Sequence, residues 1–241
     1  MASTMNFLSA HWEHLLLANY VVEPEVLQPF VPQGTKIDAF DGQIYVSLVA
    51  FMFNRMRVAG VPIPFHQSFE EVNLRFYVAP NKDPSIRAVT FIKEIVPKRS
   101  IPIISNSLFY ENYVALPMDH SSSDNHHSYS WIDHEKNTFS GTIEAELTIP
   151  ESNSLGEFIT EHYWAYVKAP RYTLEYEVRH PQWKCCEVKD YEINVDFAAN
   201  YGQSFAFLND LQPHNVLYAE GSEVSVLYPS RLKKSLSHDP H

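Results

Sequence analysis

Alternation of apolar and polar residues is the feature of this chain that most constrains its fold. Successive side chains of a β-strand point to opposite faces, so an alternating segment has one face for a core and one for a polar environment. The pattern runs through four segments, 71–78, 139–149, 172–179 and 190–197. A fifth segment, 43–53, follows an Asp41-Gly42 turn signal and is apolar on both faces, which is typical of a central strand. The chain is therefore expected to be mostly β.

Few segments carry a helical pattern. Ser154 and Glu157 have the spacing of a capping box, which predicts a helix over 155–164. A second helix is expected to begin near Pro102 and to run towards Tyr110.

The chain carries no repeat or linker that would divide its 241 residues, a length at which all-β domains often remain undivided. We expect a single domain over 1–241, with a mobile surface loop at 119–127, where Ser, Asp, Asn and His predominate, and a flexible tail at 233–241. Many short strands with few helices favour an antiparallel barrel or two packed sheets with helices over the openings. In such folds the mouth or the interior usually holds the ligand.

The charge balance limits the classes of partner. The chain has 18 Lys and Arg against 29 Asp and Glu, a formal net charge of −11, without a basic stripe. This charge balance disfavours nucleic acids and anionic membranes as partners, because proteins bind both through clustered Lys and Arg side chains. No stretch approaches a membrane span or a signal sequence, and the adjacent Cys185 and Cys186 cannot form an unstrained disulfide, so a cytoplasmic location is expected.

Common catalytic motifs are missing from the sequence. It has no GxSxG elbow, no phosphate-binding glycine loop and no dinucleotide fingerprint, which disfavours serine hydrolases, P-loop NTPases and Rossmann dehydrogenases. His120, His126, His127 and His134 match no zinc or facial-triad spacing. We therefore expect no metal and no cofactor.

The strand predicted at 71–78 has a polar face made of an acid, an amide, a guanidinium and a phenol, namely Glu71, Asn73, Arg75 and Tyr77. If that face points into a barrel, Arg75 can clamp a carboxylate and Glu71 can accept a proton. If it points to solvent, it is the ordinary wet face of an antiparallel sheet.

Two further candidates have structural alternatives. His180 and Trp183 end an alternating strand and can line or protonate a ligand, or they can form a structural corner with Trp183 buried and His180 bonded to backbone. Lys93 and Lys98 are candidate Schiff-base nucleophiles, and the alternative for each is a lysine whose amine reaches solvent.

Several segments taken in order resemble a known family: His11-Trp12, 15–20, 24–32, 71–78, 158–163 and 179–183. Together they resemble the YqjF-like family of uncharacterised proteins, placed in the acetoacetate decarboxylase-like superfamily. The resemblance implies an antiparallel, barrel-like pair of curved sheets around a cavity, with Glu71, Asn73 and Arg75 turned towards it. The superfamily's decarboxylases use a lysine pair near mid-chain, but the comparable stretch here, 108–113, has no lysine. Decarboxylation through an imine is therefore not expected.

The leading hypothesis is a small-molecule pocket protein, either a non-decarboxylating enzyme acting on a small oxo or carboxylic acid or a binder of one. The ligand is expected to be anionic. The residues assigned to the site are Glu71 and Arg75 as catalytic groups, with Asn73, Tyr110, His180 and Trp183 contacting or supporting the ligand. The alternative is a non-catalytic barrel that serves sensing or assembly, and a homo-oligomer remains open under either hypothesis.

Overall fold

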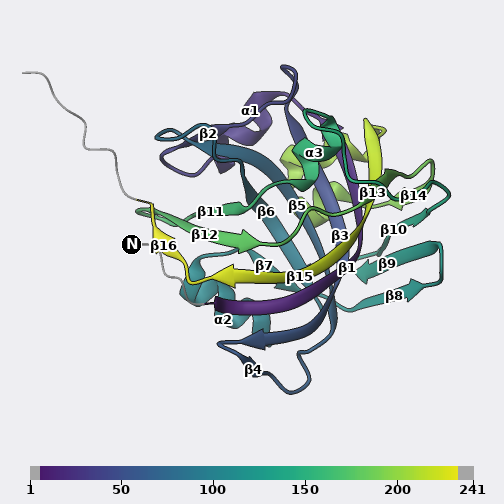
Figure 1. Ribbon diagram of the computed structural model, residues 1–241, viewed down its shortest axis with the longest axis horizontal. Helices are drawn as coiled ribbons and strands as arrows, with labels where there is room; N and C mark the ends of the chain where they lie inside the picture. Colours follow the sequence, from purple (N-terminus) through teal and green to yellow (C-terminus); the bar gives the residue numbers. More distant parts are fainter. Residues whose placement is uncertain (1–5, 233–241) are drawn as a thin grey trace, which may run out of the picture.

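The computed structural model of the protein describes residues 6–232, and the expected tail at 233–241 lies outside that range. Two sheets form most of the structure (Figure 1). The large sheet comprises β1 (Asn6–Val21), β2 (Thr35–Ile37), β3 (Tyr45–Val58), β4 (Val61–Pro62), β5 (Phe69–Pro80), β6 (Ala88–Val96), β7 (Tyr113–Ala115), β11 (Trp164–Lys168), β12 (Thr173–Arg179), β13 (Cys185–Glu187), β15 (Asn215–Leu227) and β16 (Ser230–Arg231). The small sheet comprises β8 (Met118–Ser122), β9 (His126–Ile132), β10 (Lys136–Thr142) and β14 (Asp190–Asn194). The helical elements are α1 (Pro24–Leu27), η1 (Gln28–Phe30), α2 (Ser100–Phe109), α3 (Leu155–Thr160), α4 (Phe197–Tyr201) and η2 (Gln203–Asn209).

The large sheet curls so that its two sides meet. Its strands follow the order β13-β15-β1-β3-β5-β6-β11-β12-β16, and β12 also pairs with β15 through Val178 and Val226. Pairing is antiparallel except where β6 meets β7 and β11. The fold is thus mostly β and barrel-like, as the alternation predicted.

The small sheet packs on the outer face of the large one. Trp131 of β9 and Phe139 of β10 are fully buried in one apolar cluster with Leu48 and Leu74 of the large sheet. A second cluster lines the inner face and includes Val49, Phe51 and Trp183. The two sheets agree with the fold that the resemblance implied, and the cavity lies within the curl of the large sheet, with α2, Thr160 and His162 completing its lining.

Strand β5 buries both of its faces. Val72, Leu74 and Phe76 are fully buried in the outer cluster, while Glu71 and Arg75 on the opposite face are 3% and 9% exposed. The reading of a solvent-facing polar strand is therefore wrong, because the curl of the sheet covers that face. The central strand expected at 43–53 is confirmed as part of β3, which lies between β1 and β5.

Three local expectations need correction. The segment 119–127 is not a loop but contributes to the β8–β9 hairpin, in which Asp119 pairs with Ser130 and Ser122 with His127. Strand β8 is the edge of the small sheet, and a polar edge strand has the composition of a loop.

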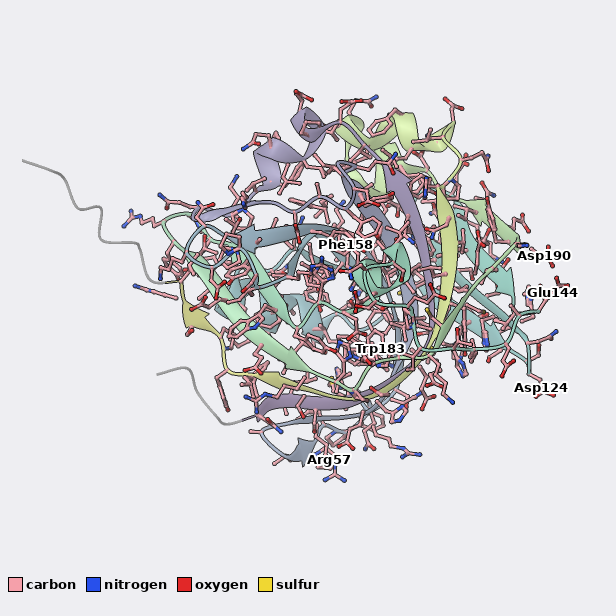
Figure 2. The ribbon with its side chains drawn as sticks, turned by 45° about the horizontal axis from the view of Figure 1, so that its top comes forward. Arg57, Asp124, Glu144, Phe158, Trp183 and Asp190 are labelled. Atoms are coloured by element: carbon pink, nitrogen blue, oxygen red, sulfur yellow. The ribbon has the colours of Figure 1, made fainter. Side chains whose placement is uncertain are left out.

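The strands expected at 139–149 and 190–197 end early, at Thr142 and Asn194. Beyond Thr142 the chain leaves the small sheet and returns to strand pairing only at Thr148, which forms an isolated antiparallel bridge with Cys185 of β13. Glu144, between these two points, lies exposed at the edge of the molecule (Figure 2). Helix α4 begins at Phe197, where the Asp196 carboxylate accepts from Ala199 N.

The two predicted helices form. Ser154 Oγ accepts from Glu157 N at 3.2 Å and caps α3, which ends at Thr160 rather than Trp164. Helix α2 ends before Tyr110, whose left-handed backbone (φ 58°) closes it. No helix within residues 6–232 is long and apolar enough to cross a membrane.

Candidate functional site

The inner face of the curled sheet encloses a cavity of about 440 Å³, a size typical of small-molecule sites. Strands β1, β3, β5, β6 and β12 and helix α2 contribute to its lining. Most of the lining is apolar and aromatic, as at Trp12, Phe51 and Phe53. Figure 2 shows Trp183 within this curl, whereas Arg57 and Asp124 lie at the periphery. Polar side chains line the cavity at several points, and buried charged groups lie at two places.

The first place is the acid cluster, which we define as Glu71, Glu94, Glu111, Tyr113 and Tyr176. The residues come from β5, β6, the turn after α2, β7 and β12, so the topology assembles them from distant parts of the chain. Tyr113 Oη donates to Glu71 Oε2 at 3.3 Å, and Tyr176 Oη donates to Glu111 Oε1 at 3.0 Å. Three carboxyl groups and two phenols thus share one region of the cavity.

Burial raises the pKa of all three acids, and repulsion by neighbouring carboxylates adds to the shift at Glu71 and Glu94. The pKa of Glu71 is raised to about 7, first by loss of hydration and to a smaller extent by Glu111, while the hydrogen bond from Asn73 opposes the shift. Burial likewise raises the pKa of Glu111 to about 7. Glu94 has a pKa well above its usual range, first because it is buried and then because of Glu111 and Glu71. Near neutral pH these groups can therefore both donate and accept protons.

The second place is Arg75. Its Nη2 donates to Ile159 O at 3.2 Å, while its Nε has no hydrogen-bond partner within residues 6–232. No ion pair to Arg75 exists in the same range. A buried guanidinium without a carboxylate is a group that a bound anion would stabilise.

His162 lies beside Arg75 in the cavity wall and is 7% exposed. Its ring packs on Tyr77, with 4.7 Å between centroids, and neither ring nitrogen has a hydrogen-bond partner in the described part of the chain. Burial, followed by the positive charge of Arg75, holds the pKa of His162 well below its usual range. The imidazole is therefore neutral at physiological pH.

Asn73 connects the two places on the same face of β5. Its Nδ2 donates to Glu71 Oε1 at 2.9 Å, and its Oδ1 is without a partner among residues 6–232. The structure thus brings Glu71, Asn73 and Arg75 together along the cavity.

His180 and Trp183 line the cavity and also form a structural corner, so both interpretations of this pair apply. They line the cavity, and their rings stack with centroids 4.0 Å apart. They also form a corner, since Trp183 Nε1 donates to Ser222 Oγ at 2.8 Å and His180 Nδ1 donates to Pro181 O at 2.9 Å.

Tyr110 was wrongly assigned to the cavity. Its left-handed backbone turns the side chain outward, where it is 43% exposed and meets the ring of Tyr172 edge-on. The neighbouring Phe109 and Glu111 line the cavity instead.

Lys93 does not face the cavity. Its Nζ donates to Asn200 O on the outer side of the sheet, and no lysine lines the cavity within residues 6–232. The histidines of the β8–β9 hairpin make other contacts, such as His120 Nδ1 to Glu70 Oε1 at 2.6 Å. No group of three or more His, Cys, Asp or Glu in the described chain could hold a metal ion.

Sequence reasoning missed Glu94, Glu111 and His162. His162 lies in the segment 155–164, which was predicted to be a helix. Glu111 lies in the segment 108–113, which was considered only for the lysine pair that it lacks. Glu94 follows a bulge in β6 between the partners of Leu74 and Arg75, and this bulge places Glu94 on the same cavity face as Phe91.

Comparisons with known proteins agree with this architecture. The chain is 28% identical over 180 residues to the uncharacterized protein YqjF of Bacillus subtilis (strain 168), covering 71% of this chain and 72% of that one. Among solved structures, the enduracididine biosynthesis enzyme MppR complexed with pyruvate superposes with a TM-score of 0.66 at 12% identity, over 94% of this chain and 90% of that one. The acetoacetate decarboxylase of Legionella pneumophila gives a TM-score of 0.66 at 8% identity, over 95% and 88%.

These likenesses establish the fold as acetoacetate decarboxylase-like. A family model, DUF2071, described as an uncharacterized conserved protein, matches residues 9–223. The chain therefore belongs to the DUF2071 family.

Proposed function

We propose that this protein binds a small oxo acid or carboxylic acid in its cavity and transfers a proton to or from it through Glu71, without forming an imine. The observation that carries the proposal is the buried, unpaired guanidinium of Arg75. A charge taken out of water is costly unless it is paired, and a ligand carboxylate can accept two parallel hydrogen bonds from a guanidinium. Arg75 would therefore fix the acid group of the ligand.

Glu71 supplies the proton-transfer group. A pKa of about 7 makes it an effective base and an effective acid near neutral pH. Asn73 and Tyr113 hold its two oxygens in place. Glu71 and Arg75 are four positions apart on the strand, so their Cα atoms lie about 13 Å apart, and the two long side chains leave room between them for a ligand of several heavy atoms.

The class of ligand has support from a structural neighbour. MppR, which shares the fold, is described as complexed with pyruvate, a 2-oxo acid. Imine chemistry is left out of the proposal because no lysine lines the cavity within residues 6–232. The simplest remaining step is removal and return of a proton on the carbon next to the oxo group, with the electron pair held on the carbonyl oxygen.

Proton exchange tests this proposal. The protein would be incubated with 2-oxobutanoate in D₂O, and loss of the C3 proton signal would be followed by proton NMR. We expect exchange catalysed by the wild type to fall by about a hundredfold in Glu71→Gln, the range seen for removing a general base. Glu70→Gln is the matched control, since Glu70 neighbours Glu71 but bonds to His120 outside the cavity. Equal exchange in wild type and Glu71→Gln would contradict the role of Glu71.

A non-catalytic sensing or assembly protein is the second candidate. Large apolar side chains are exposed on α2, on β4 and on the segment that follows β4, at Ile103 (68%), Val61 (60%) and Phe65 (89%) respectively. A hydrogen bond between His66 and Ser100 joins the segment after β4 to α2, and the two lie side by side in Figure 1. Light scattering would support this candidate if the wild type self-associates, Ile103→Ser does not, and no oxo acid exchanges protons.

A further inference from the structure

The acid cluster brings three buried carboxyl groups together without an ion-pair partner for any of them among residues 6–232. None of Glu71, Glu94 and Glu111 forms an ion pair with a residue of the described chain. Glu94 is 2% exposed, and its Oε2 has no hydrogen-bond partner among residues 6–232. An unpartnered carboxyl oxygen this deeply buried indicates a hydrogen-bond partner that residues 6–232 do not supply.

The partners of these acids favour their ionised form. Glu71 accepts from the amide of Asn73 and from the hydroxyl of Tyr113, and Glu111 accepts from the hydroxyl of Tyr176. Hydrogen-bond donors stabilise a carboxylate, whereas a protonated carboxyl needs an acceptor for its own O–H. These hydrogen bonds therefore favour the carboxylates against the effect of burial, and the countercharge is left to the ligand.

We infer that the acid cluster is a subsite for the ammonium group of a primary amine, so that the substrate class is a small amino-substituted oxo or carboxylic acid. An ammonium presents three compact donors, one for each carboxyl group, while the planar guanidinium fork suits a single carboxylate better. This inference rests on the proposed function, since it adds a second polar end to the same ligand.

The shape of the cavity suits such a dipolar ligand. Arg75 marks one end of the polar face of β5 and Glu71 the other, with Asn73 between them. Apolar side chains such as Phe91 and Val89 line the wall beside this face. A carboxylate on Arg75, a short hydrocarbon chain and an ammonium on the acid cluster would satisfy all three environments.

Binding of an ammonium must also release protons. In the empty cavity burial raises the pKa of Glu71 and Glu111 to about 7, so these acids are partly protonated at neutral pH. A bound cation favours the carboxylate and displaces those protons. Affinity for the amine should therefore fall as the pH drops below about 7, because more protons must then be released.

Titration calorimetry on a matched set of compounds tests this inference. Hexanoate carries the anion alone, hexylamine the cation alone and 6-aminohexanoate both. At pH 7.5 we expect 6-aminohexanoate to bind wild type at least about tenfold more tightly than hexanoate, equivalent to one well-made charged interaction. In Glu94→Gln and Glu111→Gln that advantage should fall below about threefold, while Glu70→Gln retains it. Two independent variants, each checked for an unchanged circular dichroism spectrum, guard against a folding defect.

Proton release is read from the same titrations. The apparent enthalpy of 6-aminohexanoate binding should differ between phosphate and Tris buffers, while that of hexanoate should not, because only the amine displaces protons into the buffer. Buffer-independent enthalpy for 6-aminohexanoate would contradict the inference.

The compounds separate this inference from the proposed function. If hexanoate binds through Arg75 and the amino group adds no affinity, the ammonium subsite is wrong and the proposed function stands. If hexylamine binds in an Arg75→Met variant and loses affinity in Glu94→Gln, the ammonium subsite stands although Arg75 does not hold the acid. If neither amine binds, the ammonium subsite is overturned.

Discussion

The two faces of the large sheet treat their buried polar groups differently. On the outer face Trp131 Nε1 donates to Asn200 Oδ1 at 2.8 Å, and Asn200 Nδ2 donates to Asn137 Oδ1 at 2.9 Å. Asn137 Oδ1 also accepts from Asp196 N, so this network is closed, with the Tyr201 hydroxyl as an unpartnered neighbour.

On the inner face several polar atoms remain open. Trp12 Nε1, Asn73 Oδ1, Arg75 Nε, Glu94 Oε2 and both nitrogens of His162 line the cavity without partners from residues 6–232. A closed network holds the two sheets together, whereas an open set needs a ligand to complete it. A buried polar side chain is therefore not by itself a sign of a binding site. A buried polar side chain that also lacks a hydrogen-bond partner is such a sign.

The largest expected effect is on the outer face. Trp131→Ala should lower the free energy of unfolding by about 3–5 kcal/mol, because it leaves a cavity and an unpaired Asn200 oxygen. Urea denaturation would measure the change. Ile132→Ala, at a 48% exposed site on the same strand, is the control, with an expected change within about 0.5 kcal/mol. Similar losses in both variants would contradict the closed outer network.

The acid cluster should make the protein less stable as the pH rises. Between the usual pKa of 4.5 and the folded pKa of about 7, Glu71 binds more protons in the folded than in the unfolded state. The free energy of unfolding should therefore fall across this interval, by on the order of 2–3 kcal/mol for Glu71. Urea denaturation from pH 5 to pH 8 should show a smaller fall in Glu71→Gln than in wild type, and parallel curves would contradict the raised pKa.

A histidine on the outer face should have the opposite slope. His127 stacks between His14 and Tyr218, and burial lowers its pKa from 6.5 to about 4. Between these values the unfolded state binds more protons, so the stability from neutral His127 is complete above about pH 6.5 and is lost as the pH falls towards 4. His127→Phe keeps the stack and should remove about 1–2 kcal/mol of the loss between pH 7 and pH 5. An unchanged acid limb in this variant would show that His127 titrates normally.

The smallest effect on stability is expected at Arg75. Arg75→Met removes an unpaired buried charge and keeps an apolar stem, so the free energy of unfolding should stay the same or rise by about 1 kcal/mol. Thermal melting would measure it. A loss of several kcal/mol would instead place Arg75 in a closed structural network like that of Asn200.

Local patterns predicted the framework of this molecule but only part of its cavity. The alternation at 71–78 identified Glu71, Asn73 and Arg75 as sharing one face, because a strand imposes that order on its own residues. It could not show that the sheet curls over that face, which depends on the pairing of β12 with β15.

Residues that reach the cavity through irregular backbone were the ones missed or misplaced. The bulge opposite Leu74 and Arg75 reverses the parity of β6, so Glu94 faces the cavity and Lys93 faces away. The left-handed residue that ends α2 turns Tyr110 outward and leaves Glu111 inside. An irregularity of one residue moves the side chains that follow it to the opposite face of the segment. The alternation of apolar and polar residues in the sequence does not reveal such an irregularity.

Calorimetric titration of the protein with 2-oxobutanoate would test directly whether the unpartnered groups of the inner face bind an oxo acid. It would compare wild type with Arg75→Met and with Arg171→Met, which removes an exposed arginine from the turn between β11 and β12. We expect wild type and Arg171→Met to bind with the same Kd, and Arg75→Met to bind at least about tenfold more weakly, as for the loss of one bidentate charged contact. Equal affinity in Arg75→Met and wild type would show that the buried guanidinium does not hold the acid.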